Sequence, residues 1–125
     1  MDPLAPALAL AQSGRLAEAL QHCERILAMR PTYAPALGLA GAIALRMGRI
    51  DDAIKRLTLA GTLDPRHAGH QLNLGEALSA AGRAAEAEAA YQRALKLEPR
   101  AARAHAGLAF LRQARGDVAG ALEAF

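Results

Sequence analysis

Few side chains in this sequence are of the types that carry out covalent chemistry. The candidate nucleophiles on predicted helices are Ser13, Thr58 and Ser79. A hydroxyl nucleophile needs a histidine base within reach and an acidic residue that orients the base. The sequence implies no such His/Asp arrangement beside these three residues. We therefore expect no catalytic residue and no enzymatic activity.

Two histidines are spaced so that they could bind a metal ion together. His67 and His70 are three residues apart, which places two imidazoles on one face of a helix. A structural zinc site needs four protein ligands and a catalytic one needs three, and no third ligand is evident here. We therefore expect no metal site, with His67 in a turn, His70 solvated and His105 packed against its neighbours.

The single cysteine and the glycines predict structure rather than chemistry. One cysteine cannot form an internal disulfide, and Cys23 occupies an apolar position where we expect it to be buried. The glycines form neither a GxGxxG motif nor a phosphate-binding loop, so we expect no nucleotide and no other cofactor. Their expected role is close packing of helices.

The charge distribution argues against nucleic-acid and membrane partners. The net charge is +3, and the basic and acidic residues are scattered along predicted helices without a dense basic cluster. No apolar run reaches the roughly 18 residues that cross a bilayer, and the N-terminus lacks the basic segment of a signal peptide. We expect a cytoplasmic protein. The Ala- and Arg-rich, Lys-poor composition indicates a GC-rich bacterial genome.

The stretch 68–99 predicts two helices joined by one turn. Apolar residues recur at helical spacing on both sides of Gly82, and glycine commonly ends a helix. Pro99 cannot continue the second helix, because it has no amide donor and clashes with the preceding turn. Proline recurs at Pro65 and Pro31, which gives a period of 34 residues. A fixed period of this size is typical of helical repeat arrays.

The residues of this stretch resemble the tetratricopeptide repeat, a helix–turn–helix unit. The matching positions are Leu74, Gly75, Gly82, Ala87, Tyr91, Ala94 and Pro99. Gln71 replaces the first aromatic residue of the family pattern, and Leu78 replaces the next one. The same register divides the chain into four units, of which the first is degenerate and the last is truncated. These units are approximately 1–33, 34–67, 68–101 and 102–125.

This resemblance implies an all-α fold, namely a right-handed superhelical solenoid of antiparallel helix hairpins. We expect seven or eight helices and no strands. The predicted turns within the hairpins are at Gly14, Gly48, Gly82 and Gly116. Because the chain stops within the second helix of its last unit, we expect a fragment of a longer protein. Leu122 and Phe125 would then be exposed at one end and promote self-association.

The resemblance also implies where a partner binds. In the family, the first helix of each hairpin lines a concave groove. The corresponding positions of this chain are Leu45, Arg46, Leu72, Asn73, Glu76, Arg103, Phe110 and Gln113. We expect Leu45, Leu72 and Phe110 to form a solvent-facing apolar floor that charged residues flank. Such a surface suits an extended or helical peptide with spaced apolar anchors.

One specialised version of the groove is not expected here. Co-chaperone members of the family hold a C-terminal carboxylate with a clamp of Lys, Asn and Arg side chains. Asn73 matches the central Asn of that clamp, and Arg103 replaces one Lys. Gly38, Ala42 and Gly107 occupy the other clamp positions, so we expect no binding of a chaperone tail.

Two classes of function follow from this reading. The first is a scaffold for protein–protein interaction that binds a partner peptide or helix in the groove. The alternative is a non-catalytic segment that regulates a larger bacterial enzyme, such as a transferase, or recruits its substrates. The sequence that follows Phe125 in the parent gene would discriminate between them.

Overall fold

A computed structural model describes the backbone of residues 2–123 and the side chains of residues 2–116. Over that backbone the chain forms only α-helices, joined by short loops, and no strand. The helices are α1 (Ala5–Gln12), α2 (Leu16–Met29), α3 (Ala34–Arg46), α4 (Ile50–Leu63), α5 (Ala68–Ala80), α6 (Ala84–Leu97) and α7 (Ala102–Glu123). The predicted all-α fold is confirmed. The predicted exposure of Leu122 and Phe125 lies outside the described side chains.

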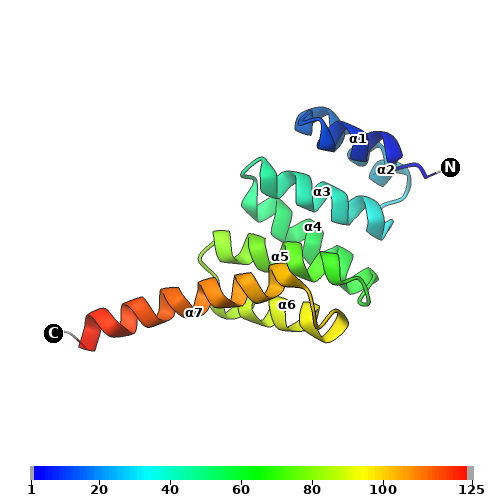
Figure 1. The fold of residues 1–125 in the computed structure, drawn as a ribbon. Coiled ribbons are helices and arrows are strands. Elements are labelled where there is room, and N and C mark those ends of the chain that lie inside the picture. The colour runs from blue at the N-terminus through cyan, green and yellow to red at the C-terminus, as the bar shows by residue number, and fades with distance from the viewer. Residues whose placement is uncertain (1, 124–125) are drawn as a thin grey trace.

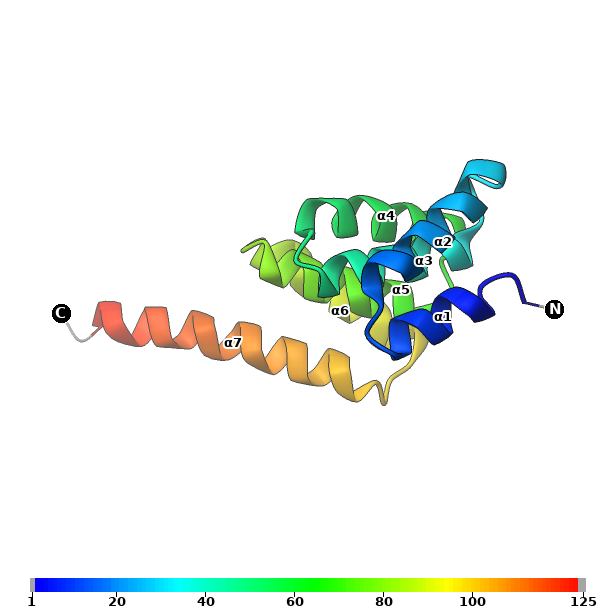
Figure 2. The same cartoon turned by 90° about the horizontal axis from the view of Figure 1, so that it is seen from above.

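Consecutive helices pair into hairpins, and the hairpins stack side by side (Figure 1). The second helices α2, α4 and α6 each pack against the first helix before them and the one after them. The first helix α5 also contacts α3 and α7, so the first helices form a layer of their own. Seen from above, α1 and α7 lie toward one side of the molecule, and α2 and α4 lie toward the other (Figure 2). We name these sides the inner and the outer layer, and the predicted helical-repeat solenoid is confirmed.

Glycine and proline set the ends of the helices. Gly14, Gly48 and Gly82 follow α1, α3 and α5 with φ of 84°, 79° and 78°. Residues with a side chain adopt that left-handed conformation at a cost of about 1–2 kcal/mol, so the turns fall at glycine as predicted. Each of the outer helices ends two residues before a proline. A residue that precedes proline is driven out of the helical conformation, which stops the helix there.

The fourth predicted turn, at Gly116, is wrong. Helix α7 continues through Gly116 to Glu123 without a break. Glycine permits a left-handed turn but does not enforce one. A hairpin is stabilised when its second helix buries an apolar face on the first, and each outer helix uses 14 residues to do so. Whether the chain turns at a permissive glycine therefore depends on such packing and not on the glycine alone.

The close approach of neighbouring helices depends on glycines that face large side chains. A Cβ atom on Gly41 would lie 2.6 Å from Cγ of Leu57, and one on Gly75 would lie 2.7 Å from the ring of Tyr91. The two pairs occupy equivalent positions in successive units. Both Leu57 and Tyr91 are buried in a core that is otherwise rich in alanine. Glycine is thus required at this position of the repeat, because a side chain there would collide with the neighbouring helix.

Candidate functional site

The solvent-facing side chains of the inner layer lie along one stripe of each helix. Most side chains of α5 are buried, because α3, α4, α6 and α7 surround it. Its other side chains fall mainly on one face at helical spacing, and the equivalent positions of α3 and α7 are also exposed or half-buried. We name the following set the inner face: Pro35, Leu39, Ala42 and Arg46 of α3, Gly69, Asn73, Glu76 and Ala80 of α5, and Arg103, Gly107, Phe110 and Ala114 of α7.

Three residues of the inner face form one hydrogen-bonded group. Arg103 donates through Nε and Nη2 to Oε1 of Glu76, at 2.9 and 2.7 Å. The same Nη2 donates to Oδ1 of Asn73 at 2.8 Å. The ion pair is solvent-exposed, so its contribution to stability is below about 1 kcal/mol. Its main effect is geometric, because it joins α5 to α7 and occupies one edge of the guanidinium.

Arg46 of the inner face is held in a different way. Its Nη1 donates to the backbone carbonyl of Ala11 at 3.2 Å, close to the end of α1. That carbonyl oxygen also accepts the backbone N–H of Gly14 at 3.1 Å, so Arg46 adds a second donor at the end of α1. Arg46 therefore links α3 to α1 across the inner layer.

Most of the predicted groove residues lie on or beside the inner face, and the buried exceptions are described below. Those that lie on the inner face are Arg46, Asn73, Glu76, Arg103 and Phe110. The Phe110 side chain is 63% exposed, so it presents an apolar ring to solvent. Gln113 is exposed on α7 beside this stripe. The inner face thus combines a satisfied polar group with exposed apolar surface.

The predicted solvent-facing apolar floor is wrong at Leu72. This side chain is 7% exposed and belongs to the same core cluster as Leu74 and Leu108, and Leu45 packs half-buried against that cluster. Each step along a helix turns the side chain by about 100°, as 3.6 residues per turn require. Leu72 precedes Asn73 of the inner face, so it points toward a neighbouring helix instead of solvent.

Sequence reasoning placed Asn73, Glu76 and Arg103 on one surface but did not predict their hydrogen bonds. The sequence spacing of these three residues could have indicated the hydrogen bonds. Asn73 and Glu76 are three residues apart and share a helix face, and Arg103 is the equivalent in the next unit of Gly69 on that same face. A long cationic side chain there can reach both oxygen acceptors on α5.

Two predictions about histidines are corrected by the structure. His70 is not solvated but 4% exposed, with its ring stacked on that of His67 at 4.1 Å between centroids. It is buried because Gly38 has no side chain and leaves room for an imidazole against α3. His105 is exposed instead of packed, because its Nε2 turns back to the carbonyl oxygen of Pro99 at 2.9 Å.

The remaining side chains that could react or bind a metal are buried or lie apart from one another. Cys23 is fully buried as predicted, and burial raises the pKa of its thiol to about 11, which keeps it protonated at neutral pH. In the described part of the chain, no three His, Cys, Asp or Glu side chains come together as metal ligands would. No described helix is long and apolar enough to span a bilayer.

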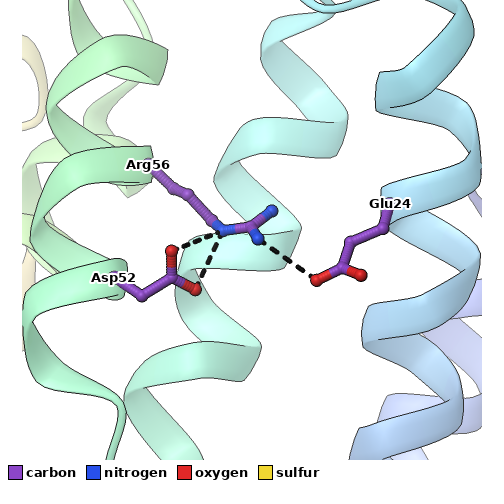
Figure 3. Close-up of polar contacts among 3 residues, drawn as sticks. All are labelled: Glu24, Asp52 and Arg56. Atoms are coloured by element: carbon purple, nitrogen blue, oxygen red, sulfur yellow. Dashed lines mark hydrogen bonds and ion pairs between the residues drawn. The ribbon is translucent and has the colours of Figure 1, made fainter.

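An ion-pair bridge joins two helices of the outer layer. Arg56 of α4 donates through Nε to both carboxylate oxygens of Asp52, at 3.1 and 3.0 Å, and through Nη2 to Oε1 of Glu24 in α2, at 3.2 Å (Figure 3). The Arg56 side chain is only 20% exposed, so the bridge is partly shielded from water. It ties α2 to α4.

Comparison with known sequences identifies a family pattern over most of the chain. A sequence profile described as tetratricopeptide repeat matches residues 10–73, and a second profile of the same description matches residues 71–101. A search of curated proteins finds no match.

Solved structures with this fold include peptide complexes and an enzyme. The second such domain of human RPAP3, solved with the HSP70 peptide SGPTIEEVD, is 21% identical over 86% of this chain and 89% of that chain, with a TM-score of 0.81. The Yersinia enterocolitica secretion chaperone SycD, solved with a peptide of the translocator YopD, is 20% identical over 90% and 91%, with a TM-score of 0.81. The O-GlcNAc transferase of Thermobaculum terrenum is 32% identical over 86% of this chain, with a TM-score of 0.83. This chain spans only 21% of that transferase.

Proposed function

Because the chain belongs to the tetratricopeptide repeat family, we propose that it is a non-catalytic scaffold that binds a partner peptide or helix along its inner face. The observation that carries this proposal is the inner face itself, where α3, α5 and α7 present one aligned stripe each. Two proteins with this fold, human RPAP3 and SycD of Yersinia enterocolitica, were solved with peptides.

The chemistry of the inner face indicates which peptide suits it. Arg103 is already bonded to Glu76 and Asn73, so its charge is largely balanced. Gly107 and Ala42 add no cation at the neighbouring positions, so Arg46, bonded to a backbone carbonyl, is the one cation of the inner face without a carboxylate partner. A highly acidic tail would therefore find little compensation for its lost hydration. The exposed ring of Phe110 favours a peptide with spaced apolar anchors instead.

Selection from a displayed library of random peptides, followed by affinity measurement, tests this proposal. We expect the selected peptides to carry spaced apolar residues. Phe110→Ala should weaken their binding about tenfold or more, as the loss of a buried aromatic anchor does. Leu59→Ala, at an exposed position of the outer helix α4, is the matched control and should leave affinity unchanged. Equal losses in both variants would sink the inner-face assignment.

A second candidate function rests on the similarity to the Thermobaculum transferase. In this case the same repeats are a non-catalytic segment that recruits substrates to, or regulates, a larger bacterial enzyme. Sequencing of the parent gene beyond the codon for Phe125 decides between the two. A reading frame that continues into a catalytic domain would favour the second candidate, and a stop codon after further repeats would favour the scaffold.

The setting of the proposed scaffold follows from the same sequence features. We propose a cytoplasmic protein whose partners are proteins or peptides and not nucleic acid or membrane, in line with its small and dispersed net charge of +3. Self-association through the ends of the solenoid stays a prediction. Concentration-dependent sedimentation would support it, and a single monomeric species at high concentration would count against it.

A further inference from the structure

A hollow of about 430 Å³ lies on the outer layer, between α4 and α6, with α5 as its floor. Its walls include Gly61 and Thr58 of α4, Gln71 and Leu74 of α5, and Arg93 and Lys96 of α6. Its volume is in the range of pockets that bind small molecules. The hollow faces away from the inner face, so it is distinct from the proposed peptide site.

Two departures from the repeat pattern line this hollow. Gly61 stands where the units before and after it have Leu27 and Leu95, and Gln71 stands where the unit before it has Leu37. A Cβ atom on Gly61 would lie 2.7 Å from Nε2 of Gln71, so the glycine makes room for the amide. The corresponding junction of α2, α3 and α4 has leucines at both places instead. There the Arg56–Glu24 ion pair also crosses from α4 to α2.

The Gln71 side chain is largely buried, and its amide has a fixed orientation. Gln71 is 8% exposed, and its Oε1 accepts a hydrogen bond from Nε of Arg93 at 2.9 Å. Because a guanidinium only donates, the acceptor oxygen must face Arg93, and the amide NH₂ must face the side of Gly61. That NH₂ makes no hydrogen bond within residues 2–116 but keeps some contact with solvent, since Nε2 of His70 is the one fully buried polar side-chain atom without a partner there. A donor on a largely buried side chain can bind a ligand that accepts its hydrogen bond without first being ordered.

The charges around the hollow are of one sign. Arg93 and Lys96 each contribute a cation, and no acidic side chain lines the hollow. The acidic residue of the adjoining depression is Glu86, which already accepts two hydrogen bonds from Arg83, at 2.8 and 2.7 Å. Leu74 and Leu97 add apolar wall beside the donors. A dianion attached to an apolar body complements this combination.

We propose that the hollow between α4 and α6 binds a phosphate monoester of a small molecule with an apolar or aromatic body. The phosphate accepts hydrogen bonds from the free guanidinium edge of Arg93, the ammonium of Lys96 and the amide of Gln71. The body packs against Leu74 and Leu97. Only a dianion balances both cations, and a phosphate offers three acceptor oxygens for these three donors.

Calorimetric titration with phenyl phosphate at pH 8, where the phosphate is a dianion, tests this proposal. We expect binding to the unaltered protein that is at least about tenfold tighter than binding of inorganic phosphate or of benzoate. Inorganic phosphate lacks the apolar body, and benzoate lacks the second charge. Absence of phenyl phosphate binding at millimolar concentration, or equal affinity for benzoate, would overturn the proposal.

Matched variants locate the site. Arg93→Gln should weaken phenyl phosphate binding about tenfold or more, because it removes a charged donor. Arg25→Gln is the control: Arg25 is exposed on α2, two units before Arg93 in the repeat register, and its loss changes the net charge equally. Equal weakening in both variants would mean that net charge, and not this hollow, attracts the phosphate.

A double variant closes the hollow without removing a charge. Gly61→Leu combined with Gln71→Leu installs the residue types of Leu27 and Leu37 at the preceding junction. We expect it to abolish phenyl phosphate binding while circular dichroism and peptide binding at the inner face stay unchanged. If the double variant does not fold, the Arg93→Gln and Arg25→Gln pair still decides. Undiminished binding by a folded double variant would refute the site.

Discussion

Two glycines of the second unit make room for polar side chains at the start of α5. Gly38 faces His70, whose Cε1 would lie 2.3 Å from a Cβ atom at that position, and Gly61 faces Gln71 in the same way. Both polar side chains are more than nine-tenths buried. They have different consequences, because Gln71 keeps a donor next to the outer hollow, whereas Nε2 of His70 is buried without a partner in the described structure.

Burial of His70 makes the stability of the protein depend on pH. Burial lowers the pKa of His70, the neighbouring His67 lowers it further, and Asp64 opposes them. The unfolded chain therefore binds this proton more readily than the folded protein does, and protonation favours unfolding. The contribution is favourable above the ordinary histidine pKa of about 6.5 and is lost as the pH falls below it.

We expect His70→Phe to reduce this acid sensitivity, because phenylalanine keeps a ring against Gly38 but does not titrate. Melting temperatures between pH 8 and pH 5 provide the measurement. The unaltered protein should lose more stability over this range than the variant. His105→Phe, at an exposed position, serves as the control and should behave like the unaltered protein. Parallel pH profiles for the unaltered protein and His70→Phe would show that His70 is not the titrating group.

The contact of Gly75 with Tyr91 predicts the effect of another single substitution. Gly75→Ala should destabilise the protein by about 1–3 kcal/mol, because the new methyl group would meet a ring that is 3% exposed. Gly69→Ala in the same helix would meet only the exposed His67 ring, and it should be neutral or stabilising by up to about 1 kcal/mol. Chemical denaturation measures both. Equal effects would mean that the ring of Tyr91 moves aside freely.

At the scale of helices, alanine allows the outer helices to pack closely on the inner ones. Ala53 and Ala87 occupy equivalent positions in α4 and α6, and both are fully buried. Ala87→Leu should overpack the hairpin of α5 and α6 and cost about 1–3 kcal/mol. Ala85→Leu, at an exposed position of the same helix, should change stability by less than about 0.5 kcal/mol. An unshifted thermal unfolding curve for Ala87→Leu would remove Ala87 from the helix contact.

The ends of the helices were largely predictable, because each depends on one local rule. Gly14, Gly48 and Gly82 adopt positive φ, and the outer helices stop before their prolines. Gly116 shows the limit of that rule, since α7 continues through it although glycine permits a left-handed turn. Sequence periodicity reports which residues can turn, but the packing of the next segment decides whether they do.

Side-chain positions on the inner layer were harder to predict than helix ends. Leu72 and Asn73 are neighbours in the sequence, yet Leu72 is core and Asn73 lies on the inner face. A helix that is covered on three sides has apolar residues almost all round, so hydrophobicity does not reveal its narrow exposed stripe. The repeat register could have assigned that stripe, because equivalent positions share their environment in successive units.

For the molecule as a whole, repetition explains the architecture and departures from repetition point to the sites. The equivalent pairs of Gly41 with Leu57 and Gly75 with Tyr91 build the same contact in successive units. The departures are Arg103, which joins α7 to α5, and Gly61 with Gln71, which line the outer hollow. The sequence already showed Gln71 in place of the family's aromatic residue, but only the structure places Arg93 beside it.

Peptide binding at the inner face can be tested by site-specific photo-crosslinking. A photoreactive phenylalanine analogue is placed at Phe110 on the inner face or, in a second protein, at Leu59 on the outer layer, both of which are exposed. Each protein is irradiated with the same library-selected peptide, and adducts are quantified by mass spectrometry. We predict an adduct from position 110 and none from position 59. An adduct from position 59 in the absence of one from position 110 would contradict the account and place the partner on the outer layer.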